Sequence, residues 1–177
     1  MRPHSLLLAI ATLILCPLAA HADTTYTYTG NPFDSVAGLY TTSDSIQGSF
    51  TVASPFLLNS SNVFTPSSFS FTDGLQTLTS LDSTGDFSVD VDSTGAFIGW
   101  NISVGSPNDS ISTFDTNFPT FDAFDGAVLD LGVNSGENSH APGTWTVTNP
   151  VPEPSTLALL ASGALGLLTH IRRRLSL

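Results

Sequence analysis

Basic residues are missing from the central part of this chain. Residues 23–149 contain no lysine and no arginine, because the four basic residues, Arg2 and Arg172 to Arg174, lie near the two ends. The same stretch holds 14 of the 15 acidic residues, since only Glu153 lies outside it. This imbalance excludes any mechanism that needs a lysine or arginine there. So negative a surface also repels nucleic acid and anionic lipid, and we expect no nucleic-acid partner.

Cysteine is almost absent as well. The single cysteine, Cys16, lies in an N-terminal segment that we expect to be removed from the mature protein. The mature chain would then have no disulfide, no thiol nucleophile and no thiolate metal site. Its fold must therefore depend on the packing of its core.

The first 22 residues have the features of a secretory signal peptide. Arg2 precedes a short apolar run that ends with the small residues Ala20 and Ala22. This arrangement predicts export by the Sec machinery and cleavage between Ala22 and Asp23. The alternative is an uncleaved anchor helix, but Pro17 and the shortness of the apolar run argue against it.

Residues 23–149 are predicted to form one all-β domain, a single β-sandwich or a jelly-roll-like fold. High net charge favours disorder, but aromatic and aliphatic residues alternate with polar ones throughout this stretch, as in half-buried strands. Asp73-Gly74 and the segment Asp92 to Gly95 are typical of hairpin turns. The predicted strands are 25–30, 48–52, 68–72, 87–91, 97–104, 127–133 and 144–148.

In two of these predicted strands, the alternation of residues also predicts which side chains face the core. In 97–104, the alternation places Ile98, Trp100, Ile102 and Val104 on one face. In 127–133, it aligns Leu129, Leu131 and Val133.

The segment 106–126 is predicted to be a loop and is the best candidate for a metal site. Calcium prefers six to eight hard oxygen ligands, which a loop rich in aspartate can supply. The alternative is that the aspartates form turns and are solvated, while phenylalanines anchor the loop to the core. No other cofactor is expected. The candidate ligands are Asp109, Asp115, Asp122 and Asp125.

Catalysis has little support in the sequence, and we expect a protein that is not an enzyme. His140, the only histidine in 23–149, lies in ENSHAPG, which is predicted to be a loop. Two functions remain: a non-catalytic surface or matrix protein, and a carbohydrate-binding module aided by calcium. The second would need exposed aromatic side chains, and the candidates are Trp100, Trp145, Phe114, Phe118, Phe121 and Phe124.

The C-terminal segment combines three features in a fixed order. The first is the kinked sequence Pro152, Glu153 and Pro154. An apolar stretch over 155–171 follows, which is barely long enough as a helix to cross a bilayer core. The basic residues Arg172, Arg173 and Arg174 then predict a cytoplasmic C-terminus by the positive-inside rule. A plain membrane anchor would explain the helix and the arginines, but not the Pro-Glu-Pro sequence.

Residues 150–177 resemble the PEP-CTERM sorting signal of Gram-negative bacteria. The resemblance implies that an exosortase, a membrane enzyme, recognises the tail and cleaves near Pro-Glu-Pro. It also implies a precursor that spans the inner membrane and a product at the cell surface or in the extracellular matrix, often alongside exopolysaccharide. The stretches GSFTV, SFSFTDG and DSTGAFIGWNIS are similar to the β-rich bodies of uncharacterised PEP-CTERM proteins, which carry no known activity.

Overall fold

Twelve β-strands make up the regular structure of the residues that the structure describes. The computed structural model describes residues 23–116, 122–139 and 141–148, which lie within one unit, residues 23–150. We call this unit the body. The strands are β1 (Thr24–Pro32), β2 (Ser35–Ala37), β3 (Ser45–Val52), β4 (Ser60–Phe64), β5 (Ser68–Thr72), β6 (Thr77–Thr79), β7 (Thr84–Val91), β8 (Phe97–Gly105), β9 (Ser110–Thr116), β10 (Asp122–Leu129), β11 (Asn134–Ser139) and β12 (Thr144–Thr148).

Both predicted terminal segments fall outside the described residues. These are the signal peptide (1–22) with its cleavage site, and the tail with Pro-Glu-Pro, the apolar helix over 155–171 and the arginines. No helix in residues 23–116, 122–139 or 141–148 is long and apolar enough to cross a membrane.

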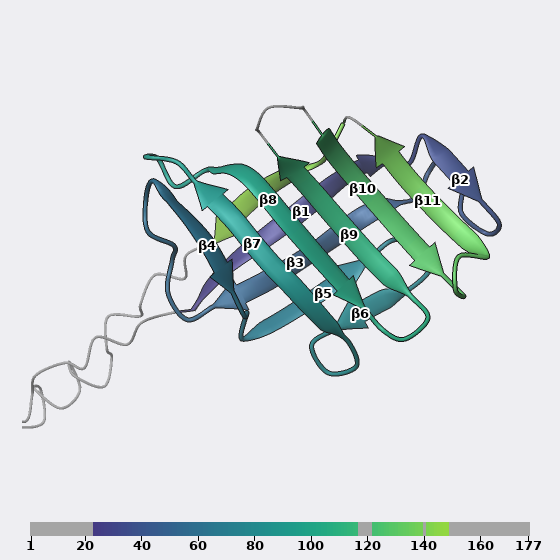
Figure 1. Ribbon diagram of the computed structural model, residues 1–177, viewed down its shortest axis with the longest axis horizontal. Helices are drawn as coiled ribbons and strands as arrows, with labels where there is room; N and C mark the ends of the chain where they lie inside the picture. The colour runs from purple at the N-terminus through teal and green to yellow at the C-terminus, as the bar shows by residue number, and fades with distance from the viewer. Residues whose placement is uncertain (1–22, 117–121, 140, 149–177) are drawn as a thin grey trace, which may run out of the picture. The chain divides into compact units, whose positions relative to one another are not determined.

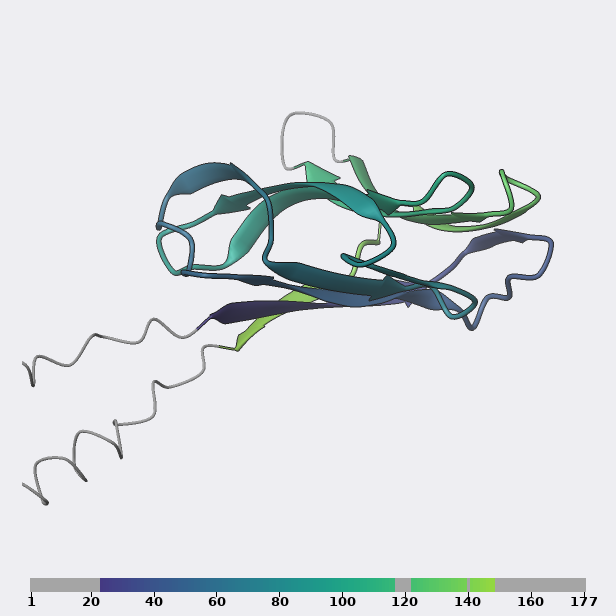
Figure 2. The ribbon, with the colours of Figure 1, turned by 90° about the horizontal axis from the view of Figure 1, so that it is seen from below.

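The strands form two antiparallel sheets that pack face to face (Figures 1 and 2). The five-stranded sheet has the order β12-β1-β3-β5-β6, and the seven-stranded sheet has the order β2-β11-β10-β9-β8-β7-β4. The predicted all-β class and the two-layer arrangement are therefore confirmed. The alternation of polar and apolar residues explains this packing, because each sheet must bury one face.

The core between the sheets is unusually rich in aromatic rings. Phe50 of β3 is fully buried, and its ring lies 5.2 Å from that of Tyr26 and 5.3 Å from that of Trp145. Across the interface, the ring of Phe87 on β7 lies 5.8 Å away. Aromatic contacts of this kind join the two layers without any disulfide.

Both predicted hairpin turns are present. The Asp73-Gly74 turn joins β5 to β6, and Gly74 has a φ of 99°. The segment Asp92 to Gly95 joins β7 to β8, and Gly95 has a φ of 89°. These left-handed conformations favour glycine, which is why Asp-Gly and Asp-x-x-Gly predict such turns.

The prediction of a loop over residues 106–126 was wrong for most of the described part of this segment, because residues 110–116 and 122–126 lie in strands. The segment contains β9 and most of β10, which pair in antiparallel register. The prediction for 127–133 was also partly wrong, since β10 ends at Leu129. Asp130 and Leu131 have φ values of 56° and 57°, which turn the chain away from the sheet. As a result Leu131 and Val133 are exposed rather than aligned with Leu129.

The predicted buried face of the strand at 97–104 is correct for Trp100, Ile102 and Val104 and wrong at Ile98. Asp90 pairs with Gly99, but Val91 pairs with Phe97, so a β-bulge leaves Ile98 without a partner in the register. At the bulge, the side chain of Ile98 is 46% exposed, whereas that of Trp100 is only 8% exposed. Ile102 and Val104 are buried, as predicted. Five strands were not predicted, namely β2, β4, β6, β9 and β11.

Candidate functional site

Of the four predicted calcium ligands, the structure describes the side chains of Asp109, Asp115 and Asp125, and it does not bring these three into one site. Asp109 lies in the turn before β9, where Oδ1 accepts a hydrogen bond from the amide of Asp130 at 3.0 Å. Asp115 lies within β9 and Asp122 begins β10. Asp125 is fully buried. Within the described part of the chain, no three acidic, histidine or cysteine residues are grouped so that they could hold a metal ion.

The most unusual polar group in the body is the buried carboxyl of Asp125. The alternation along β10 directs it into the core, where the Tyr28 hydroxyl donates a hydrogen bond of 2.6 Å to Oδ1. The amide of Gly143 in turn donates to the Tyr28 hydroxyl oxygen at 2.6 Å. Burial raises the pKa of Asp125 to about 6, and the groups at Tyr28, Thr113 and Gly143 oppose that rise only in part. Burial and the adjacent Asp125 also raise the pKa of Tyr28.

A second buried oxygen lies across the strand pair from this carboxyl. Asp125 and Asn138 are register partners on β10 and β11, and both are buried. Among the described residues, neither Asp125 Oδ2 nor Asn138 Oδ1 has a hydrogen-bond partner. An ionised carboxylate offers only acceptors, whereas a protonated one carries a donor. Burial therefore favours the protonated form of Asp125, and the polar groups around it oppose this only in part.

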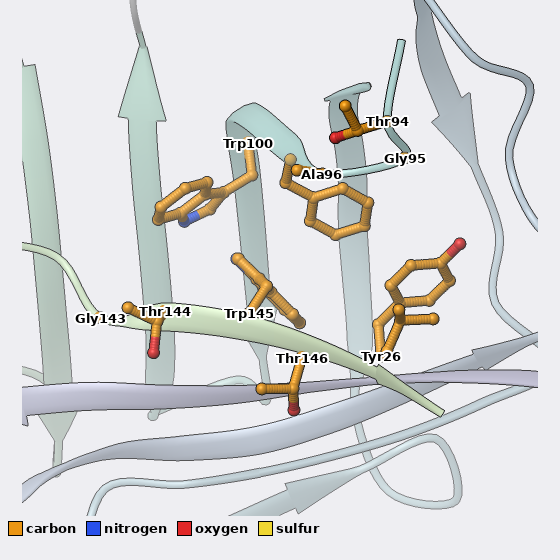
Figure 3. A pocket seen from close by; sticks show the side chains of 11 residues that line it. Tyr26, Thr94, Gly95, Ala96, Trp100, Gly143, Thr144, Trp145 and Thr146 are labelled. Atoms are coloured by element: carbon orange, nitrogen blue, oxygen red, sulfur yellow. The ribbon is translucent and has the colours of Figure 1, made fainter. Parts of the chain in front are cut away.

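The two tryptophans line an apolar opening at one edge of the body. A cavity of about 470 Å³ lies between β12 and the turn that joins β7 to β8, with Tyr26, Phe97, Trp100 and Trp145 in its wall (Figure 3). Trp100 Nε1 donates a hydrogen bond of 2.9 Å to Thr113 Oγ1. The rings of Trp100 and Trp145 meet at 78°, with centroids 6.3 Å apart. The tryptophans thus serve the core and do not form a flat, exposed surface for a sugar.

Two of the phenylalanine candidates do meet on an outer surface. Phe114 of β9 and Phe124 of β10 are register partners on the outer face of the seven-stranded sheet, which faces the viewer in Figure 1. Their rings are nearly parallel, with an interplanar angle of 26° and centroids 5.3 Å apart. Both side chains are partly exposed. The other two candidates, Phe118 and Phe121, lie outside the described residues.

Sequence reasoning did not identify the buried pair of Asp125 and Asn138. Aspartate is usually exposed, so the residue type alone gave no reason to expect Asp125 in the core. The alternation of Phe124, Gly126 and Val128 with Asp125 and Ala127 was the available signal, because it places Asp125 on the face opposite Phe124.

Comparison with known proteins gives one match. Residues 150–174 match the family model described as the PEP-CTERM protein-sorting motif. No curated protein and no solved structure matches the chain. The match begins two residues after the last described strand ends at Thr148, and it includes the Pro-Glu-Pro sequence and all three terminal arginines. The chain therefore carries a PEP-CTERM sorting motif at its C-terminal end, which marks it as an exported protein sorted by an exosortase.

Proposed function

We propose that this protein is a non-enzymatic component of the cell surface or extracellular matrix, processed at its tail by an exosortase-type enzyme. The observation that carries this proposal is the order of the parts along the chain. The last described strand of the two-sheet body ends at Thr148, and the sorting motif begins at residue 150. A cut near Pro-Glu-Pro therefore removes the tail without cutting any described strand of the body.

The two terminal segments define the route in this proposal. The signal peptide carries the body across the inner membrane by the Sec machinery and is cleaved before Asp23. The apolar segment 155–171 then holds the precursor in the membrane, with the three arginines in the cytoplasm. Cleavage near Pro-Glu-Pro releases the body to the surface or the extracellular medium.

The chemistry of the body supports a non-catalytic role. Asp125 has a raised pKa, as a general acid would need, but it is buried and bound to Tyr28. The outward aspartates at turns instead accept hydrogen bonds from their own loops. Asp92 Oδ1, for example, bonds the amides of Thr94 at 2.7 Å and Ala96 at 3.0 Å. These carboxylates stabilise turns.

The first prediction concerns the ends of the mature protein. Protein recovered from its native host is expected to begin at Asp23 and to end near Pro152 to Pro154, as measured by its intact mass. Intact mass is the suitable measurement because trypsin has no Lys or Arg to cut after between Asp23 and Asn149. A precursor in which Pro152, Glu153 and Pro154 are all replaced by alanine serves as the matched control and should keep its tail. A wild-type mass that extends to Leu177 would show a lasting anchor and contradict the proposed processing.

A second function, carbohydrate binding by the body, is favoured by one observation. The Phe114–Phe124 pair is a partly exposed pair of stacked aromatic rings on a sheet face. The apolar face of a sugar ring packs well on such a surface. Exopolysaccharide outside the cell would be the partner. The calcium assistance suggested by the sequence is not part of this proposal, because Asp125 is buried away from the Phe pair.

A further inference from the structure

The Phe114–Phe124 pair is the centre of a row of side chains that crosses five strands. Residues directly opposite each other in antiparallel strands share a face of the sheet, so the strand register identifies the members of the row. Each of them lies next to at least one buried residue along its strand and therefore faces outward. From β7 to β11 the row consists of Ser88, Asn101, Phe114, Phe124 and Ser139.

The neighbouring row explains why Phe124 lies against the sheet. Gly126 is two residues along β10 and on the same outer face, and a Cβ atom there would overlap the Phe124 ring. The ring therefore occupies the space above Gly126. Next to it, Ser112 and Ser103 are joined by a hydrogen bond of 2.9 Å. The surface beside the ring pair is consequently made of short side chains.

The spacing of the row suits an extended glycan chain. Neighbouring strands lie about 4.8 Å apart, which is close to the length of one sugar unit in an extended chain. A glycan that runs perpendicular to the strands would therefore meet about one side chain of the row for each sugar. The ring pair presents an apolar surface at the centre. Asn101 and Ser88 on one side, and Ser139 on the other, supply hydroxyl and amide groups that donate and accept hydrogen bonds. Sugars in an extended, β-linked chain present the matching pattern of apolar faces and hydroxyl edges.

The charge of the body decides which polysaccharides fit. The body has 14 acidic residues and no lysine or arginine, and the exposed Glu137 of β11 lies beside the row, opposite Gly126. An anionic polymer would meet repulsion and no cation to bind. A neutral polymer meets neither obstacle, and its hydroxyl groups can donate to the carboxylate.

We propose that the row Ser88–Asn101–Phe114–Phe124–Ser139 binds a neutral, extended, β-linked polysaccharide that lies across the strands. One sugar packs on the Phe114–Phe124 pair, and its neighbours bond the polar side chains of the row. This inference rests on the proposed export of the body, since such polymers lie outside the cell. It adds to that proposal a ligand class and a surface.

Affinity electrophoresis of the mature protein tests the inference. Native gels would contain hydroxyethylcellulose as a neutral β-linked probe, carboxymethylcellulose as its anionic counterpart, or soluble starch as a neutral α-linked polymer. Hydroxyethylcellulose is expected to retard the wild-type protein, and the other two polymers are expected to have little effect. Phe114→Ala and Phe124→Ala should each weaken the retardation roughly tenfold, because each removes half of the stacking surface.

Two further variants separate binding from folding. Gly126→Ala keeps both rings but displaces Phe124 from the sheet, so it should weaken binding while the protein stays folded by circular dichroism. Leu131→Ala removes an exposed apolar side chain from the turn after β10 and should bind as the wild type does.

Three results would overturn the inference. They are no retardation of the wild type by hydroxyethylcellulose, equal retardation of the wild type and the Phe variants, and equal retardation by carboxymethylcellulose. In the second case, a lower melting temperature of the variants would identify the ring pair as a cross-strand contact that only stabilises the sheet. None of these results bears on tail processing, which the intact mass tests separately.

Discussion

Raising the pH from 4 to 8 is expected to lower the free energy of unfolding of the body, and Asp125→Asn is expected to remove about 2 kcal/mol of that loss. A folded-state pKa of about 6 against an ordinary value of 3.8 corresponds to about 3 kcal/mol in all, at about 1.36 kcal/mol per pKa unit, and part of this is already lost at pH 4, where the unfolded chain is more than half ionised at this position. The direction follows from proton binding. Between these two pKa values the folded protein holds a proton on Asp125 that the unfolded chain has released, so stability falls as pH rises.

The groups around Asp125 explain why the Asn variant should lose this dependence of stability on pH. The groups that face it are the hydroxyls of Tyr28 and Thr113, the amide of Gly143 and the side chain of Asn138. Among the described residues, Tyr28 is the one titratable group that influences its pKa, and it stays neutral over this pH range. In the Asn variant, the side-chain oxygen can still accept from Tyr28, and the amide nitrogen supplies a donor that faces Asn138.

The matched control is Asp86→Asn. Asp86 is an exposed carboxylate on β7, so this variant removes the same formal charge from the body without changing the core. Repulsion among the remaining carboxylates also lowers stability as pH rises, and both variants relieve it by one charge. Urea unfolding at pH 4, 5, 6, 7 and 8 would give the three curves. Parallel curves for the two variants would show that Asp125 has no special role.

The second large effect is expected from the aromatic core. Phe50→Ala should lower the free energy of unfolding by about 3–5 kcal/mol, as is usual when a large buried aromatic side chain is truncated. Phe50 is fully buried, and its ring contacts residues of both sheets, including Tyr26, Phe87 and Trp145. No disulfide compensates for the loss in the mature chain. Because small domains are stable by only about 5–15 kcal/mol, this substitution should bring the body close to unfolding.

Leu81→Ala is the control for that experiment. Leu81 is 96% exposed, so its truncation should change stability by less than about 0.5 kcal/mol. Denaturant unfolding at pH 5 gives both values under one condition. A loss below about 1 kcal/mol for Phe50→Ala would mean that the aromatic cluster is not what joins the two sheets.

The alternation of polar and apolar residues predicted strands where apolar side chains occupy every second position. The segments 68–72 and 144–148 coincide with β5 and β12, because each has apolar side chains at alternate positions and ends at a turn. The prediction failed where the backbone departs from that period. The bulge beside Ile98 and the left-handed pair Asp130 and Leu131 both reverse which side chains face the core.

The strand β9 and the first part of β10 were missed for a different reason. Their sequences contain Asp and Ser at positions that usually indicate turns, and the phenylalanines were interpreted as anchors of a loop. In the structure Phe114 and Phe124 face outward, while Thr113 and Asp125 occupy the core. Such an inversion depends on partners far apart in the chain, Tyr28 above all, and no short window of sequence contains them.

The sorting motif could be recognised from sequence because it is a linear signal. Its three parts are read in order along residues 150–174, and no tertiary contact is needed to identify them. The row across the seven-stranded sheet is the opposite case. Its five members lie on five strands, and only the register of those strands places them in one line.

The position of β12 has a mechanical consequence for a body that is still attached to its tail. Strand β12 is at the edge of the five-stranded sheet and has a single neighbour, β1, with Thr148 opposite Thr25. A pulling force that reaches the body through the tail acts first at Thr148, at one end of the hydrogen bonds between β12 and β1. Hydrogen bonds that are loaded from one end break one after another, at a lower force than bonds that are loaded all at once. The side chain of Trp145, packed between Tyr28 and Phe50, is then the anchor that resists the peeling of the strand.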